Sequence, residues 1–162
     1  MIRPAKSTDV PTIARLIRAL AEYERLSHRV DFDESKLREH LFGPKPAAEV
    51  LLAEDGGRVV GFALFFPNFS TFRGTPGIYL EDLFVEPEMR GKGYGKALLL
   101  ALAKLAVERG CARLEWSVLN WNEPAIQFYK KLGAVPMDEW TVYRLTDDAL
   151  KQAASASKGG TP

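Results

Sequence analysis

The chain has 162 residues, of which 46% are hydrophobic and 27% charged, so it has the size and apolar content of one globular domain with a buried core. Its net charge of +1 gives no sign of the basic surface typical of nucleic-acid-binding proteins. Its longest apolar stretch, residues 97–103, is shorter than the roughly 20 residues of a membrane-spanning helix, and its single cysteine excludes a disulfide within the chain.

The first half of the chain predicts a short strand, two helices and a hairpin. Residues 2–4 form a candidate edge strand, and the polar residues that follow can cap a helix running to about Glu24. A second helix is expected over residues 33–42, where Gly43 and Pro44 end it. Apolar runs at 49–54 and 58–66, on either side of a Gly-Gly turn, predict a β-hairpin.

The second half alternates strands and helices. Residues 67–77 are rich in turn formers and predict a loop. The remaining elements are expected to be strands at 78–85, 112–119 and 140–145, helices at 93–109 and 122–132, and a frayed tail at 153–162. Because a helix connects them, the strands before and after the long helix should be parallel. The fold class is therefore α/β, with one domain over residues 1–152, a mixed central sheet of about six to seven strands and about four flanking helices.

A glycine-rich segment, Arg90-Gly91-Lys92-Gly93-Tyr94-Gly95-Lys96, connects a predicted strand to the long helix. The N-terminus of a helix has unpaired N–H groups and a partial positive charge, and glycines let the backbone approach an anion closely. A P-loop would need Ser or Thr at Ala97, and a dinucleotide fingerprint would need Gly at Lys96. The alternative is a plain flexible turn, but the segment predicts a site for the pyrophosphate of a nucleotide-type cofactor.

Two motifs in this order resemble the GNAT superfamily of acetyl-CoA-dependent N-acetyltransferases. The first is Arg90-x-x-Gly93-x-Gly95, and the second is Asn122-Glu123-Pro124-Ala125-x-x-Phe128-Tyr129-x-x-x-Gly133-Ala134. The resemblance covers roughly residues 2–146. Together with Glu24, the strand that reads Tyr79-Leu80-Glu81-Asp82-Leu83-Phe84-Val85 looks like the diamine and polyamine branch, which includes the spermidine/spermine and thialysine N-acetyltransferases.

The resemblance implies a GNAT-type domain, acetyl-CoA as co-substrate and a homodimer. It implies that the cofactor lies against the third central strand, the glycine-rich segment and the second motif. The residues concerned are Leu83, Phe84, Val85, Arg90, Gly91, Lys92, Gly93, Tyr94, Gly95, Lys96, Asn122, Pro124, Ala125 and Tyr129.

Acetyl transfer to an amine requires a proton acceptor, because an alkyl ammonium has a pKa near 10.4 and deprotonation near neutral pH costs roughly 4 kcal/mol. Glu81 and Asp82 are adjacent in an otherwise apolar strand, where alternation puts them on opposite faces unless a bulge intervenes. The resemblance implies that Glu81 contacts the amine, directly or through water. Glu24 is a second candidate for the base, and both carboxylates could instead be ordinary solvated groups.

The other two requirements are an oxyanion donor and a general acid. The resemblance implies a backbone N–H near Leu83 as the donor and Tyr129 as the acid that protonates the CoA sulfur; a half-buried core tyrosine is the alternative. Nothing in the sequence near Cys111 would activate its thiol, so we expect it to pack as a small apolar side chain. Direct transfer in a ternary complex is therefore expected.

Acidic and aromatic residues together suit an alkylammonium acceptor. The predicted acceptor site consists of Tyr23, Glu24, Glu81, Asp82, Trp116 and Glu139. The strand around Glu115-Trp116-Ser117-Val118 departs from the polyamine enzymes, so a diamine, a polyamine and a lysine-like amine all stay open. His28 and His40 lack further zinc ligands, and we expect surface positions and no metal.

The leading hypothesis is a cytoplasmic N-acetyltransferase that acts on a small primary amine, with no nucleic-acid or membrane partner. Two alternatives remain open: a protein or peptide N-acetyltransferase, and a non-catalytic CoA-binding sensor.

Overall fold

The computed structural model describes residues 1–156. They fall into two compact units, Met1–Ser117 and the residues from Val118 onward, and each is described by itself. Within the described residues, no helix is both long enough and apolar enough to cross a membrane.

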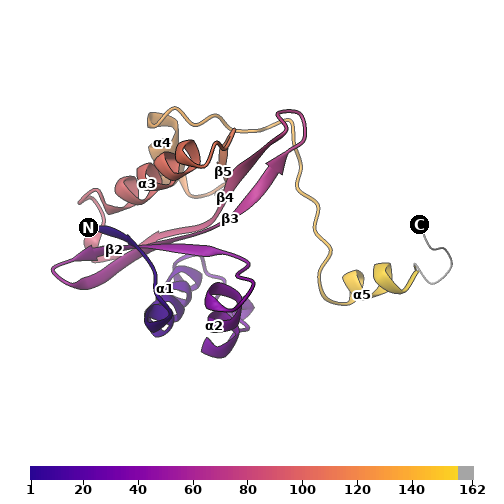
Figure 1. Ribbon diagram of the computed structural model, residues 1–162, viewed down its shortest axis with the longest axis horizontal. Helices are drawn as coiled ribbons and strands as arrows, with labels where there is room; N and C mark the ends of the chain where they lie inside the picture. Colours follow the sequence, from indigo (N-terminus) through magenta and orange to yellow (C-terminus); the bar gives the residue numbers. More distant parts are fainter. Residues whose placement is uncertain (157–162) are drawn as a thin grey trace. The chain divides into compact units, whose positions relative to one another are not determined.

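The first unit contains a five-stranded sheet in the order β1-β2-β3-β4-β5 (Figure 1). Its strands are β1 (Ile2–Pro4), β2 (Glu49–Asp55), β3 (Arg58–Ser70), β4 (Thr75–Val85) and β5 (Leu114–Trp116). The first four pair in antiparallel fashion along the chain, and β5 is parallel to β4. This confirms the predicted edge strand, the hairpin and the parallel crossover.

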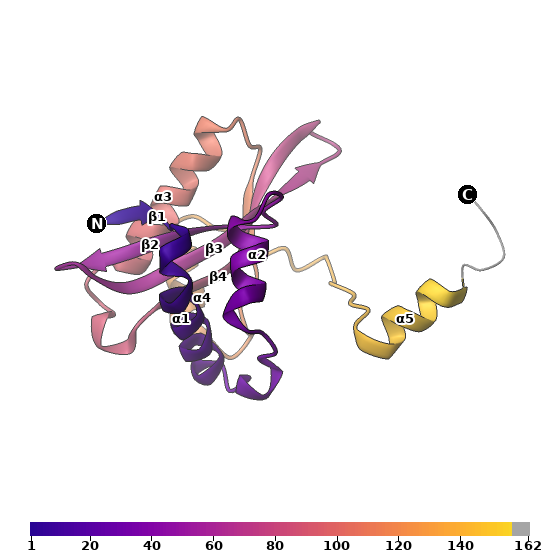
Figure 2. The ribbon, with the colours of Figure 1, turned by 60° about the horizontal axis from the view of Figure 1, so that its bottom comes forward.

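Helices cover both faces of this sheet. Two of them, α1 (Val10–Tyr23) and α2 (Glu34–Phe42), lie side by side on one face, and α3 (Tyr94–Glu108) lies on the other (Figures 1 and 2). Asp33 caps α2, because its side chain accepts a hydrogen bond from the Lys36 N–H. Short 3₁₀ turns occur at Ser7–Asp9, Ser27–Arg29 and Pro87–Met89.

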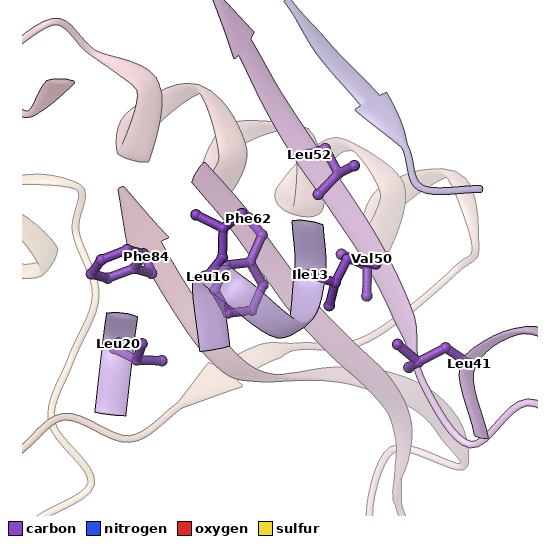
Figure 3. Packing of buried hydrophobic residues seen from close by; sticks show 8 residues of the cluster. All are labelled: Ile13, Leu16, Leu20, Leu41, Val50, Leu52, Phe62 and Phe84. Carbon is purple, nitrogen blue, oxygen red and sulfur yellow. The ribbon is translucent and has the colours of Figure 1, made fainter. Parts of the chain in front are cut away.

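The core between α1 and the sheet is formed by apolar side chains at helical spacing on α1 and by inward-facing strand residues (Figure 3). Ile13 and Leu16 of α1, Leu52 of β2 and Phe62 of β3 are all fully buried. Phe84, near the end of β4, joins the same cluster and packs against the Phe62 ring. The core therefore fixes α1 against the end of β4.

The second unit contains α4 (Glu123–Lys131) and α5 (Asp147–Ala156). The Asn122 side chain caps α4 by accepting a hydrogen bond from the Ala125 N–H, and Pro124 lies in the first turn. The segment expected to fray, 153–162, begins inside α5, and its last six residues lie outside the described part of the chain.

Two predicted boundaries were wrong. The expected loop at 67–77 is instead the extended end of the β3–β4 hairpin, whose turn is only residues 71–74. Pro67 is tolerated because β2 pairs with β3 only as far as Phe65, so the outer edge of β3 needs no N–H there. The strand expected at 112–119 is reduced to Leu114–Trp116, which is as far as its pairing with β4 extends.

The strand predicted at 140–145 is also absent from the described residues, so the sheet has five strands and not six or seven. The segment has no regular structure, and Trp140, Val142 and Tyr143 are exposed. Its apolar and β-branched composition favours an extended backbone, but a strand forms only where a neighbouring strand pairs with it. The described residues contain five α-helices, including α5, in place of the predicted four.

We predict that Phe62→Ala lowers the free energy of unfolding by about 3–5 kcal/mol, because it leaves a cavity at a fully buried position. Urea unfolding of the purified variant measures this loss. The matched control is Phe72→Ala in the hairpin turn, where the ring is 98% exposed, and it should leave stability nearly unchanged. Equal losses in the two variants would contradict the assigned core.

Candidate active site

The glycine-rich segment begins α3, as expected for an anion site. Gly91 and Gly93 have φ angles of 77° and 88°, which favour glycine, and Gly93 is the N-cap of the helix. A side chain at either position would meet no neighbouring atom, so glycine is required there by backbone conformation and not by crowding. The segment therefore exposes backbone N–H groups at the positive end of a 15-residue helix.

Next to this segment, β4 has an outer edge without a strand partner in the described residues. Pairing with β5 stops at Leu80, while pairing with β3 continues to Val85. The Glu86 N–H donates to the Val60 carbonyl on β3, and backbone groups alternate between the two edges of a strand. Leu83 and Val85 consequently direct their N–H and C=O groups to the outer edge, whereas the Phe84 backbone faces β3.

A β-bulge occurs where β4 and β5 separate. Leu64 pairs with Asp82 but Phe65 pairs with Leu80, so Glu81 is an extra residue without an opposite partner. The bulge changes the alternation of side chains, leaving Glu81 exposed and Asp82 partly buried. It places two adjacent carboxylates at the beginning of the outer edge.

Glu24, which follows the last residue of α1, joins these two carboxylates. Burial, followed by the negative charges of Glu81 and Glu24, raises the pKa of Asp82 from 3.8 to about 7. Burial also raises the pKa of Glu24. Within residues 1–156, none of these three side chains has a cation or hydrogen-bond donor as a partner. We call Glu24, Glu81 and Asp82 the acidic trio.

The Arg90 side chain links the glycine-rich segment to the end of α1. Its guanidinium lies 4.2 Å from the centre of the Tyr23 ring and 5.5 Å from that of Phe84, and its Nε donates to the Val85 carbonyl at 2.9 Å. The Arg90 side chain therefore contacts other groups of the protein, and the backbone next to it lies at the predicted anion site. Lys92 lies in the segment itself, with its Nζ 3.5 Å from the Met89 sulfur.

The first unit therefore brings together most of the predicted site. Tyr23, the acidic trio, the outer edge of β4 and the glycine-rich segment are all contributed by α1, β4 and the start of α3. Trp116 ends β5 and pairs with Leu80, directly before the bulge.

The second unit contains the other predicted residues. Asn122, Pro124 and Ala125 form the start of α4, and Tyr129 lies one turn further on, with its ring 5.4 Å from that of Phe128. Glu139 lies in an exposed turn.

Sequence reasoning missed one charged group beside this site. Glu86, directly after β4, is buried and forms ion pairs with Arg15 of α1 and Arg58 of β3. These partners are 71 and 28 residues away along the chain, so no local pattern could reveal them.

The remaining candidate groups have no evident role in the site. His28 and His40 are exposed, as predicted, and Cys111 is partly buried. In the described part of the chain, no group of three or more His, Cys, Asp or Glu side chains is arranged to hold a metal ion.

Comparisons with known proteins agree with this arrangement. Residues 15–134 match the model of the acetyltransferase (GNAT) family. The bovine (Bos taurus) thialysine N-epsilon-acetyltransferase is 41% identical over 95% of this chain and 96% of its own length. The L-ornithine N5-acetyltransferase NATA1 of Arabidopsis thaliana is 37% identical over 93% of this chain and 86% of its own.

Solved structures show the same fold. An integron cassette protein from the mobile metagenome of V. cholerae superposes with a TM-score of 0.80 at 28% identity, over 95% of this chain and 96% of its own. The ribosomal-protein-alanine N-acetyltransferase of Brucella melitensis biovar Abortus 2308 gives 0.73 at 26% identity, over 91% and 99%. With a family match over most of its length, the chain belongs to the GNAT family of acetyltransferases, whose members use acetyl-CoA as co-substrate.

Proposed function

We propose that this enzyme transfers the acetyl group of acetyl-CoA to a primary amine of a small cationic acceptor, such as a diamine, a polyamine or a lysine-like amine. The observation that carries the proposal is the acidic trio, three carboxylates that have no cationic partner among the described residues and lie where the outer edge of β4 begins. Relatives named for thialysine and ornithine acetylation, both small amines, support it.

Electrostatics favours a cation at the acidic trio. Bringing carboxylates together away from bulk water is unfavourable unless a positive charge offsets their repulsion. The raised pKa of Asp82 reflects first its burial and then the negative charges of Glu81 and Glu24. An alkylammonium placed among the three would relieve that repulsion. Tyr23 lies next to Glu24 in the chain, and its ring contacts the Arg90 guanidinium.

The cofactor site on this unit has the features that acetyl-CoA needs. Helix α3 offers its N-terminal N–H groups to a pyrophosphate through Gly91 and Gly93, and Lys92 and Lys96 add positive charge. The outer edge of β4 offers the Leu83 N–H and C=O and the Val85 N–H to an extended amide chain such as pantetheine. When bound, acetyl-CoA supplies an acetyl thioester, whose C–S bond breaks as the new C–N bond forms.

In this mechanism, Glu81 takes the proton of the acceptor ammonium, directly or through a water molecule, and Glu24 is the second candidate. Asp82 is an additional proton acceptor, because its pKa of about 7 is matched to neutral pH. The Leu83 N–H donates a hydrogen bond to the thioester oxygen as negative charge develops there. Tyr129 gives its phenolic proton to the CoA sulfur.

We further propose a cytoplasmic homodimer without a nucleic-acid or membrane partner. The single cysteine and the net charge of +1 support the location and the lack of a nucleic-acid site. A run of exposed apolar side chains supports self-association: Val135, Met137, Trp140, Val142, Tyr143 and Leu145.

Acetylation of small amines is the first prediction of this function. Purified protein with acetyl-CoA should release free CoA thiol with at least one of spermidine, putrescine, lysine, ornithine and thialysine. A panel of peptide amines should give little release, because the acidic trio is suited to a compact cation. Activity on peptides alone would favour the protein acetyltransferase, and acetyl-CoA binding with no release on either panel would favour the sensor.

The pKa of Asp82 predicts how stability depends on pH. The Asp82 carboxyl has a pKa of about 7 in the folded state and about 3.8 in the unfolded chain. The folded state therefore binds more protons than the unfolded chain between these two pH values. The free energy of unfolding should therefore fall as pH rises from about 4 to 7, by at most about 4 kcal/mol from this group. Asp82→Asn should lack this fall and exceed the wild type in stability at pH 8. Urea unfolding at pH 5 and pH 8 measures the difference.

The matched control is Asp31→Asn, which removes an exposed carboxylate from the segment before α2. It should show the same pH dependence as the wild type. If Asp82→Asn also follows the wild-type profile, the carboxyl does not titrate as described.

Tyr129→Phe tests the general acid. Loss of the phenolic proton should lower kcat by about 100-fold or more while leaving the dissociation constant for acetyl-CoA within about twofold. Cys111→Ala is the control and should keep wild-type kcat, since transfer is direct. Unchanged turnover in Tyr129→Phe would contradict the acid role, and ping-pong kinetics would contradict direct transfer.

A further inference from the structure

Glu86 is a buried carboxylate that links α1 and β3 directly after the end of β4. Its side chain is only 6% exposed, and its two oxygens accept hydrogen bonds from the Arg15 Nη1 and the Arg58 Nη2, each at 2.5 Å. Arg15 lies on α1, which ends at Tyr23, and Arg58 begins β3. The two ion pairs therefore connect α1 and β3 through the residue that follows β4.

The backbone of Glu86 lies where sheet pairing ends and the cofactor segment begins. Its N–H donates to the Val60 carbonyl at 2.9 Å, the last strand-like contact along β4. Its C=O accepts from the Met89 N–H, also at 2.9 Å, which closes the short turn at Pro87–Met89. Met89 is itself buried and directly precedes Arg90. The direction in which the chain leaves the sheet is thus set at Glu86.

We propose that Glu86 is a positioning residue for the cofactor: the Arg15–Glu86–Arg58 bridge fixes the path from the end of β4 into the glycine-rich segment. This inference rests on the proposed acetyl-CoA site. A Cβ at Gly91 or at Gly93 would meet no atom within 4 Å. The position of this stretch depends on the residues that flank it, which are Glu86 with its turn and the Arg90 side chain on one side and α3 on the other.

Charge alone does not explain a glutamate at this place. A carboxylate near a pyrophosphate site repels the ligand, so removing its charge should strengthen acetyl-CoA binding if only electrostatics mattered. A positioning role predicts the opposite sign, because the backbone N–H groups of the segment would be less well ordered before binding. Glu86→Gln separates the two explanations, since it keeps the shape of the side chain and removes its charge.

Glu86→Gln should change the binding of acetyl-CoA and not that of the amine acceptor. Asp82 is held by its own pairing with Leu64, and the Glu24 N–H is bonded to the Leu20 carbonyl of α1. Neither depends on the turn that follows Glu86. Glu86→Gln should therefore raise KM for acetyl-CoA by about 3- to 30-fold, with kcat and the KM for the amine within about twofold of the wild type.

Glu49→Gln is the matched control. Glu49 also forms close ion pairs with an arginine, accepting two hydrogen bonds from Arg109 at 2.7 and 2.8 Å. That pair lies at the other end of α3, about 22 Å from the glycine-rich segment along the helix. The control should keep the wild-type KM for acetyl-CoA. Tighter acetyl-CoA binding in Glu86→Gln, or an equal loss in both variants, would overturn the positioning role.

Hydrogen exchange gives a readout that does not need activity. Without cofactor, the Met89 and Arg90 amides, which donate to the Glu86 and Pro87 carbonyls, should exchange at least about fivefold faster in Glu86→Gln than in the wild type or Glu49→Gln. If Glu86→Gln does not fold, Arg15→Met, which leaves the Arg58 contact in place, should show a smaller acceleration in the same amides. Unchanged exchange in the folded variant overturns the inference. A wild-type protein that neither binds nor uses acetyl-CoA would instead overturn the proposed function, while the exchange experiment would still test Glu86.

Discussion

The separation of β4 from β5 after Leu80 is the constraint on which the rest of the site depends. From Ile78 to Leu80, β4 pairs with a strand on each edge. Beyond Leu80, β3 is the strand that pairs with β4 among the described residues, and the other edge carries polar backbone groups that need a partner. The bulge at Glu81 occurs at the same point, so the two adjacent carboxylates lie where the outer edge begins.

Helix α1 contributes to this site at two levels. Its apolar face packs on Phe62 and Phe84, which fixes the helix against the end of β4. Its polar positions then contact the chain after β4 twice, through Arg15 at Glu86 and through Tyr23 at Arg90. The core therefore holds Glu24 relative to the outer edge of β4, and the two charged contacts connect α1 to the chain at the start of the glycine-rich segment. Geometry between two substrates depends on such rigid support.

Local pattern was sufficient to predict most of the elements but not their ends. The apolar spacing of α1 and the Gly-Gly hairpin turn are local signals, and both were confirmed. The Pro67–Gly77 segment was mistaken for a loop because its turn formers lie within a paired hairpin, where partner strands decide the structure. The expected strand at 140–145 failed for the same reason, since strand formation depends on a neighbour that the sequence does not specify.

The residues of the candidate site could likewise be predicted only where their signals are local. The glycine-rich segment could be recognised because helix ends and positive φ angles have local signatures. Whether Glu81 and Asp82 diverge or meet depended on a bulge, which the sequence left open and the pairing of Leu64 and Phe65 decides. Glu86 was not recognised at all, because a buried carboxylate is identified by its distant partners.

The acidic trio also has a thermodynamic consequence for the fold. Three carboxylates that lack a counter-charge within residues 1–156 lower the stability of the ligand-free protein, so a compact cation that fits among them adds its binding free energy to folding. Melting temperature then becomes a measure of acceptor fit that requires neither cofactor nor turnover. Cations that differ only in the spacing of their amines would be ranked by how far they raise it.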